Sequence, residues 1–250
     1  MRIANNANDV IARRTQQVLC DTKWHTFLTR AWLFRHIPFV EAAFGAGSLA
    51  IGNVNENSDF DVLVCAREGR IFTARFFAVV LFGLWGWRRS KFDHGERGSD
   101  KICLNHFVTP AAYRLRLPGN SYWQLLYQRL VPLYGDTAIV QKFFDANADW
   151  TGQRSGAGDE RQRVFVRSVF KKAQEALLAG SLGNWFEAKL KVYQIKRIKR
   201  GLPTPGDHRQ PHRIVITNTK HQETIQLEPS IIYTDTELDF QPNPAIVELI

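Results

Sequence analysis

The segment FGAGSLAIGNVNENSDFDVLVC, residues 44–65, contains the pattern that decides the fold. Gly47 and Ser48 follow a short apolar stretch, and a polar loop then leads to Asp59 and Asp61, which alternate with apolar residues. Alternate residues of a strand share a face, so the two carboxylates are expected to project together. Two carboxylates at the mouth of a buried strand are costly unless a cation lies between them. The segment therefore predicts a site for a hard divalent cation that carries a phosphate group.

The hydrophobic spacing around this segment predicts an α+β fold, with a small mixed β-sheet flanked by helices and a helical C-terminal region. Strands are expected over residues 39–44, 59–66, 101–108 and 213–217. Helices are expected over residues 8–35, 71–87, 121–149 (in two pieces divided near Pro132 and Gly135), 159–178 and 184–199.

The polar, glycine-rich stretch TGQRSGAG, residues 151–158, is the best candidate for a boundary. It predicts a first domain over residues 1–150 and a helical region with a short strand-containing tail over residues 159–250. A chain of 250 residues is long enough for one domain with an appended lobe.

The order of an apolar strand, Gly-Ser, a spacing of roughly ten residues and Asp-apolar-Asp-apolar resembles the DNA polymerase β-like nucleotidyltransferase superfamily. The variant in this chain most resembles small stand-alone nucleotidyltransferase domains, such as aminoglycoside nucleotidyltransferases and the minimal nucleotidyltransferases of antitoxin systems. The resemblance covers residues 39–66 and extends more weakly to residue 108. It implies a nucleotidyltransferase fold over residues 1–150, Mg²⁺ held by Asp59 and Asp61, and a nucleotide near Ser58.

The chemistry of the Gly-Ser pair agrees with that resemblance. Gly47 would let backbone N–H groups approach phosphate oxygens, and Ser48 would offer a hydroxyl at the start of a helix, where the dipole favours anions. The small domains commonly carry an arginine at the position that Ile51 occupies here, so one phosphate or acceptor contact is missing.

The chain also departs from the family at the third carboxylate, which usually comes from a later strand and serves as metal ligand or general base. The corresponding strand, residues 101–108, has no acid; Asn105 takes the expected slot, with His106 beside it. An amide ligates Mg²⁺ weakly and cannot take a proton. His106 is either a base or a structural histidine, and Asp93 and Asp100 either replace the missing acid or form solvated ion pairs.

The net charge of +9 and the pI near 9.7 favour anionic partners, although a merely basic surface is an equal alternative. Four arginines near the motif are candidates for a triphosphate contact or plain surface residues: Arg67, Arg70, Arg88 and Arg89. The helix over residues 184–200 combines basic and aromatic residues, which suits an RNA or DNA backbone as well as a solvated face: Trp185, Lys189, Tyr193, Lys196, Arg197 and Arg200.

A soluble, cytoplasmic protein is expected. Three widely spaced cysteines without a CxxC pair indicate reduced thiols, and the N-terminus lacks the apolar segment of a signal peptide. The apolar stretch in residues 71–89 is shorter than the roughly 20 residues of a membrane span, so a buried helix is predicted. An interfacial helix remains the alternative.

These observations predict an enzyme, a Mg²⁺-dependent nucleotidyltransferase that transfers a nucleoside monophosphate from an NTP, with ATP the expected donor, to a hydroxyl group. The acceptor would be a small molecule, a protein or an RNA end, placed over the C-terminal helices. Asp59, Asp61 and Asn105 are the predicted catalytic residues. The alternative is a catalytically weak module that binds nucleotides or a partner, as an antitoxin would, because the third carboxylate is missing.

Overall fold

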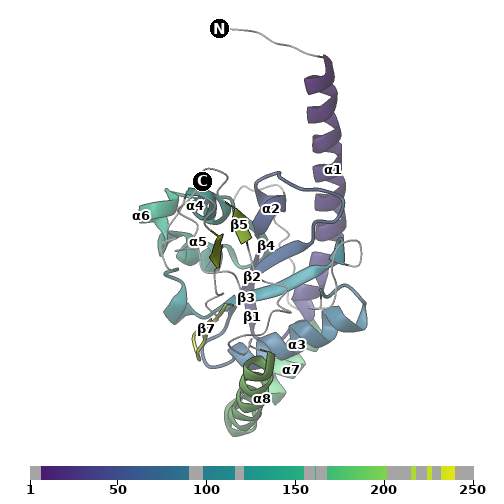
Figure 1. Ribbon diagram of the computed structural model, residues 1–250. Helices are drawn as coiled ribbons and strands as arrows, with labels where there is room; N and C mark the ends of the chain where they lie inside the picture. The colour runs from purple at the N-terminus through teal and green to yellow at the C-terminus, as the bar shows by residue number, and fades with distance from the viewer. Residues whose placement is uncertain are drawn as a thin grey trace.

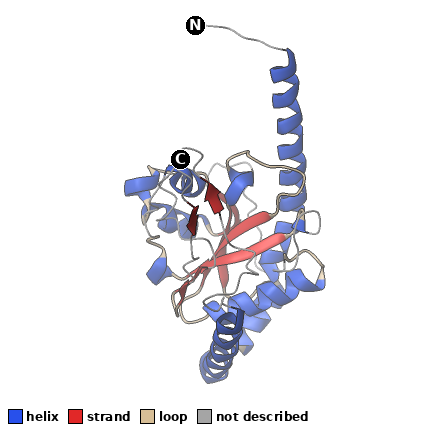
Figure 2. Ribbon diagram, viewed as in Figure 1, coloured by secondary structure: helices blue, strands red, loops and turns tan. Residues whose placement is uncertain are grey.

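The computed structural model describes residues 7–89, 98–115, 121–154, 161, 168–201, 215–217, 224–226 and 232–239. These residues form an α+β fold in which a six-stranded sheet in the order β4–β1–β2–β3–β8–β7 lies between helices (Figures 1 and 2). Strands β2 and β3 are parallel and all other neighbours are antiparallel, so the sheet is mixed, as predicted. The strands are β1 (Val40–Gly45), β2 (Phe60–Ala66), β3 (Ile102–Val108), β4 (Val131–Gly135), β7 (Ile232–Tyr233) and β8 (Glu237–Asp239).

One face of the sheet packs against an aromatic-rich core. The elements on this face are α1 (Ala7–Ala31), the 3₁₀ helix η1 (Trp32–His36), α3 (Ile71–Leu84), α7 (Val169–Leu177) and α8 (Gly180–Gly201). The Phe27 ring on α1 stacks on Phe60 of β2 at 4.8 Å between centroids, and Phe34 meets Phe82 of α3 at 5.0 Å. All four rings are fully buried, and each contributes about 1.5–3 kcal/mol through removal from water.

The opposite face of the sheet is covered by α4 (Ser121–Gln128), α5 (Thr137–Asp145) and α6 (Ala148–Thr151). Phe44 of β1 packs against Phe143 of α5 at 4.7 Å between ring centroids. Asp136 begins α5 by accepting a 2.8 Å hydrogen bond from the Ala138 N–H. The sheet is therefore buried on both sides over most of its width.

The region of residues 121–149 differs from the prediction of two helical pieces. Strand β4 occupies the point at which the two pieces were expected to divide, and it pairs with β1 at the edge of the sheet. An edge strand tolerates Pro132, which has no N–H to donate to a ladder. Gly135 has a φ of +133°, and a Cβ there would lie 2.7 Å from the Ala42 Cβ, so the close approach of β4 to β1 requires glycine.

Two segments beyond residue 150 join the first part of the chain. Helix α8, the predicted 184–199 helix, packs on α3, where the Glu187 carboxylate accepts hydrogen bonds of 2.9 and 2.8 Å from the Phe72 and Thr73 N–H groups. Strand β8 pairs with β3. The division into two domains stays a prediction.

The remaining C-terminal predictions are only partly covered by the described residues. Helix α7 forms the end of the predicted 159–178 helix, and of its earlier positions only Arg161 and Ser168 lie within the described residues. The predicted strand at 213–217 corresponds to β5 (Val215–Thr217), which pairs with β6 (Thr224–Gln226) in a separate two-stranded sheet.

The apolar stretch in residues 71–89 is a buried helix, as predicted. Helix α3 ends at Leu84, and Phe72, Ala78 and Phe82 face the core. Among the described helices, none combines the length and the apolar character needed to cross a membrane.

A β-bulge in β3 determines which side chains share a face. Asp61 lies opposite Cys103 and Leu63 lies opposite His106, so β3 carries one extra residue between these two pairs. As a result the neighbours Asn105 and His106 both reach the α4 side of the sheet: Asn105 contacts Asp61, and His106 meets the Tyr127 ring. In a regular strand they would point to opposite faces.

Candidate functional site

Two aspartates come together at the start of β2, on the α4 side of the sheet. Asp59 lies just before the strand, and Asp61 is its second residue, directly opposite Cys103 of β3. One ligand atom from each of Asp59, Asp61 and Cys103 lies within 4.8 Å of the others. These three residues, with Gly47 and Asn105, are called the Asp59–Asp61 site below.

Gly47 lies directly against Asp61. It begins the short helix α2 (Gly47–Ala50) with a φ of +69°, and a Cβ at this position would be 2.1 Å from the Asp61 Oδ2. The preceding residue is fixed as well, because the Ala46 N–H donates a 2.9 Å hydrogen bond to the Asp61 carbonyl oxygen. A side chain at position 47 would therefore collide with the carboxylate, so it is glycine that lets Asp61 lie directly against the start of α2.

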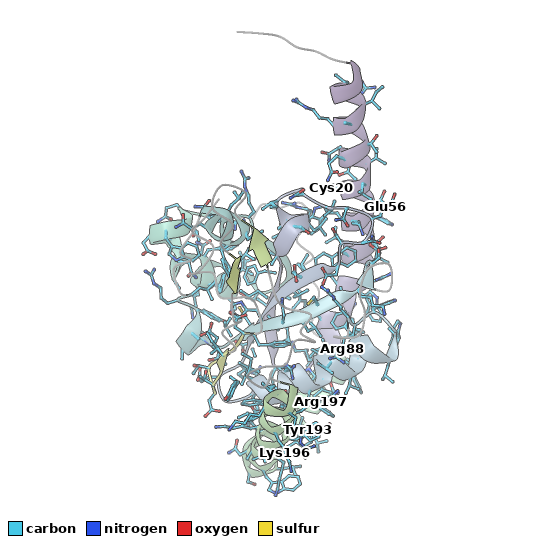
Figure 3. The ribbon with its side chains drawn as sticks, in the orientation of Figure 1. Cys20, Glu56, Arg88, Tyr193, Lys196 and Arg197 are labelled. Atoms are coloured by element: carbon cyan, nitrogen blue, oxygen red, sulfur yellow. The ribbon has the colours of Figure 1, made fainter. Side chains whose placement is uncertain are left out.

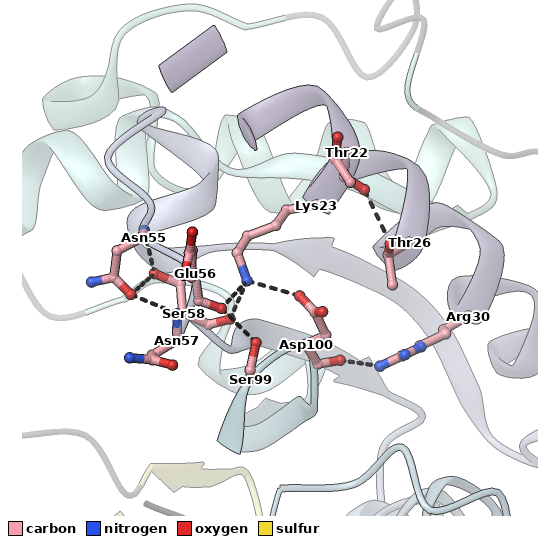
Figure 4. Close-up of polar contacts among 10 residues, drawn as sticks. All are labelled: Thr22, Lys23, Thr26, Arg30, Asn55, Glu56, Asn57, Ser58, Ser99 and Asp100. Atoms are coloured by element: carbon pink, nitrogen blue, oxygen red, sulfur yellow. Dashed lines mark hydrogen bonds and ion pairs between the residues drawn. The ribbon is translucent and has the colours of Figure 1, made fainter. Parts of the chain in front are cut away.

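A buried lysine holds the loop that precedes Asp59 (Figure 4). The Lys23 ammonium of α1 donates to the Glu56 carbonyl at 2.9 Å, the Ser58 carbonyl at 3.0 Å and the Asp100 Oδ1 at 2.8 Å. Lys23 is 4% exposed, so these three acceptors replace its hydration. Lys23 thus joins the loop before β2 to the turn before β3, and so fixes both strands of the site relative to α1.

The charges of the Asp59–Asp61 site are only partly neutralised. Arg89 donates a charge-assisted hydrogen bond to the Asp59 Oδ2. Burial raises the pKa of Asp61 to about 7, and the neighbouring Asp59 carboxylate adds to the shift, whereas Arg89 opposes it. A cation that entered the site would lower this pKa again, so proton and metal compete for Asp61.

The donor set fits Mg²⁺. The side-chain amide of Asn105 donates to the Asp61 Oδ1 at 3.3 Å, and its own Oδ1 is buried without a hydrogen bond within the described part of the chain. Two carboxylates and an unsatisfied amide oxygen are the hard oxygen ligands that Mg²⁺ prefers. Cys103 does not add to this set, because burial, followed by the Asp61 and Asp59 charges, raises the pKa of its thiol well above the usual range.

The other two predicted nucleotide-binding residues, Ser48 and Ser58, lie in different elements. Ser48 follows Gly47 on α2, and its half-buried hydroxyl makes no hydrogen bond to the described residues. The Ser58 hydroxyl is engaged in its own loop, where it accepts from the Asn55 N–H at 2.9 Å.

Of the candidates for the missing acid, Asp100 is placed away from the site. Asp100 is held by Lys23 on the α1 side, and Asp93 lies outside the described residues. His106 belongs to a different group of side chains, with Glu237 and Asp239. No described acid of β3 takes the place of a third carboxylate, and the strand position facing Asp61 belongs to Cys103 rather than to Asn105.

Of the four arginines considered for a triphosphate, Arg89 is the one placed at the site. Arg67 pairs instead with Glu41 and Glu175, and Arg70 donates to the Asn184 side chain at 2.7 Å. These contacts tie the end of β2 to α7 and α8.

The basic helix α8 lies away from the two aspartates. Its labelled residues Tyr193, Lys196 and Arg197 are at the far end of the molecule from Glu56, which is in the loop before Asp59 (Figure 3). Tyr193 and Trp185 are more than half exposed, and the Lys189 ammonium lies 5.9 Å from the centre of a Trp185 ring. Helix α8 packs on the face of the sheet opposite Asp61, and the expected position of an acceptor over the C-terminal helices stays a prediction.

Sequence reasoning missed two contributors to this site. Lys23 belongs to no sequence motif. A lone lysine among the apolar positions of a helix nevertheless indicates a buried ammonium group with hydrogen-bond acceptors around it. Cys103 carries no sequence signal of its own, because its place opposite Asp61 depends on the register of β3 against β2. Comparison of the chain with protein-family models, with curated proteins and with solved structures found no match.

Proposed function

We propose that this protein is a Mg²⁺-dependent nucleotidyltransferase, in line with the resemblance of residues 39–66 to the DNA polymerase β-like superfamily. The observation that carries the proposal is the convergence of Asp59 and Asp61 beside Gly47, a glycine that no other residue can replace without displacing Asp61, with the Asn105 side chain in contact with Asp61. Carboxylate and amide oxygens beside a backbone free of side chains suit a metal–triphosphate ligand.

In this proposal each residue has a limited task. Asp59, Asp61 and Asn105 would hold Mg²⁺, which when bound stabilises the charge on the triphosphate and its leaving pyrophosphate. Gly47 lets Asp61 lie against the start of α2, and Ser48 would offer its hydroxyl to the phosphates. Arg89 lies close enough to Asp59 to contact the same phosphates once the metal takes over that carboxylate.

The acceptor hydroxyl has no dedicated base among the groups that contact Asp61. Asn105 cannot take a proton, and the raised pKa of Cys103 keeps its thiol protonated. We therefore expect turnover to be slow and to increase with pH, because solvent has to accept the proton.

The test uses α-³²P-labelled ATP, GTP, CTP and UTP with Mg²⁺, with total RNA and the protein itself as acceptors. We expect the wild type to transfer label and Asp61→Asn to lose at least about 100-fold of the rate, because a metal ligand is removed. Asp21→Asn, at an exposed position on α1, is the matched control and should keep full activity. Labelling by Asp61→Asn at the wild-type rate would show that the assignment is wrong.

A second candidate function is a nucleotide-binding module without turnover. Two observations favour it: a neutral thiol stands opposite Asp61, and Arg89 already neutralises Asp59. Calorimetry with Mg-ATP separates the two functions, since tight binding without release of pyrophosphate indicates the module. Absence of any nucleotide binding in the presence of Mg²⁺ would rule out both.

A further inference from the structure

A second group of metal-ligating side chains lies where β3 pairs with β8. His106 of β3 stands directly opposite Asp239 of β8, and Glu237 is two residues along the same strand. One ligand atom from each of the three lies within 4.8 Å of the others. These residues are called the His106 cluster below.

His106 is the unusual member. It is 2% exposed, and neither ring nitrogen makes a hydrogen bond within the part of the chain that the structure describes. The nearest carboxylate oxygen, Glu237 Oε1, is 3.4 Å from the Nε2, which is ion-pair distance without hydrogen-bond geometry. Buried polar atoms in native proteins have partners, so a buried imidazole without hydrogen bonds to the described residues, beside two carboxylates, points to a ligand bound at one of its ring nitrogens.

Repulsion between the carboxylates strengthens this argument. Glu237 and Asp239 are on the same face of β8 and are both half-buried, so their charges are only partly screened by water. Burial raises the pKa of the nearby Tyr127 phenol well above its usual range, and Asp239, Glu237 and Asp61 raise it further. Tyr127 is therefore held as a neutral phenol beside the two carboxylates.

The ligand types identify the class of ion. One imidazole and two carboxylates suit a borderline divalent cation such as Zn²⁺, whereas Mg²⁺ prefers oxygen ligands alone. We propose that His106, Glu237 and Asp239 bind a divalent transition-metal ion of the Zn²⁺ class, which fastens β8 to β3. With three protein ligands, the fourth position of a tetrahedral ion would be open.

This site is distinct from the Asp59–Asp61 site. His106 lies opposite Leu63, two residues along β2 from Asp61, which separates the two groups by roughly 7 Å along the strand. Paired catalytic metals lie about 3.5–4 Å apart, much closer than this. The two groups also share no residue.

The experiment is titration of the metal-free full-length protein with ZnCl₂ by calorimetry, with Co²⁺ absorption as a second readout of an imidazole-ligated ion. We expect a Zn²⁺ equivalent that His106→Gln loses, its affinity falling by about 100-fold or more. His25→Gln, at an exposed position on α1, should bind as the wild type does. Where His106→Gln does not fold, Glu237→Gln/Asp239→Asn takes its place, because both side chains are less buried than His106.

Two further variants keep this proposal separate from the proposed function. Asp61→Asn and Cys103→Ser should keep the Zn²⁺ equivalent while Asp61→Asn loses nucleotidyl transfer. The proposal is overturned if Zn²⁺ fails to bind stoichiometrically, if His106→Gln binds it as tightly as the wild type, or if Asp61→Asn and Cys103→Ser lose it instead. In the last case the ion belongs to the Asp59–Asp61 site.

Discussion

The Asp59–Asp61 site and the His106 cluster both place two acids on the α4 side of one sheet, but they differ in how the charge is balanced. At the first site, Arg89 is paired with Asp59, and burial raises the pKa of Asp61 to about 7. At the second, the adjacent side chain is a buried histidine without hydrogen bonds to the described residues. The first site can therefore exist without a metal, whereas the second depends more strongly on an added ion.

The largest expected effect comes from Lys23, which supports only one of the two sites. Lys23→Met leaves two carbonyls and Asp100 without their buried partner, and we expect a loss of about 3 kcal/mol in the free energy of unfolding. Urea denaturation measures this loss. Nucleotidyl transfer should fall with it, whereas Zn²⁺ binding by the folded variant should be unchanged. An unaltered denaturation midpoint would mean that Lys23 does not anchor the loop.

The raised pKa of Asp61 should be visible in the pH dependence of the free energy of unfolding. Its pKa is raised from 3.8 to about 7 on folding, so the folded state holds a proton that the unfolded state releases. The stabilisation from this group is complete below about pH 4 and is lost as the pH rises to about 7, with a total change of a few kcal/mol. The difference in unfolding free energy between wild type and Asp61→Asn should therefore change over this window, and Mg²⁺ should stabilise the wild type more at pH 8 than at pH 5.5.

A double-mutant cycle tests the contact between Gly47 and Asp61. Gly47→Ala should cost about 2 kcal/mol, of which about 1 kcal/mol is backbone strain at positive φ and the rest is displacement of Asp61. In an Asp61→Ala background most of the second part should disappear, because only the contact with the Cβ at 3.0 Å is left. Gly52→Ala, at a glycine with positive φ and open space around it, is the control for strain alone. Equal costs at Gly47 in both backgrounds would contradict the contact.

The smallest expected effect concerns the ion pair that distinguishes the first site. Arg89→Gln removes a partly exposed cation from Asp59, so the loss of stability should stay below about 1 kcal/mol. Stabilisation by Mg²⁺ should increase, because the metal no longer competes with the guanidinium. A thermal shift series with and without Mg²⁺ measures both, and a reduced response to Mg²⁺ would show that Arg89 assists metal binding instead.

The core of the first site was predictable from sequence because it is local. Gly47, Asp59 and Asp61 are within fifteen positions of one another, and alternation along one strand was enough to place both carboxylates on one face. The strand that follows was also predictable in extent. The residue that β3 places opposite Asp61 was not predictable, because one extra residue in β3 changes which side chain faces Asp61. A bulge leaves no periodic signal in the sequence.

The parts of the fold that were missed depend on long-range pairing. Residues 131–135 carry Pro132 and Gly135, which ordinarily end an element, and only the edge position beside β1 makes a strand there stable. The three residues of β8 are too few for any hydrophobic pattern. Their place beside β3, and with it the whole His106 cluster, follows from tertiary contacts alone.

The pairing of β8 with β3 also sets an order of assembly during synthesis. Both aspartates, their glycine and β3 leave the ribosome early, but β3 keeps an unpaired edge until about 130 more residues have followed, a delay of roughly ten seconds at ordinary elongation rates. An open strand edge is a template for pairing with other chains. The nascent protein therefore has a period in which aggregation competes with the arrival of its own final strand, and chaperone dependence should be greatest for variants that weaken the β3–β8 edge.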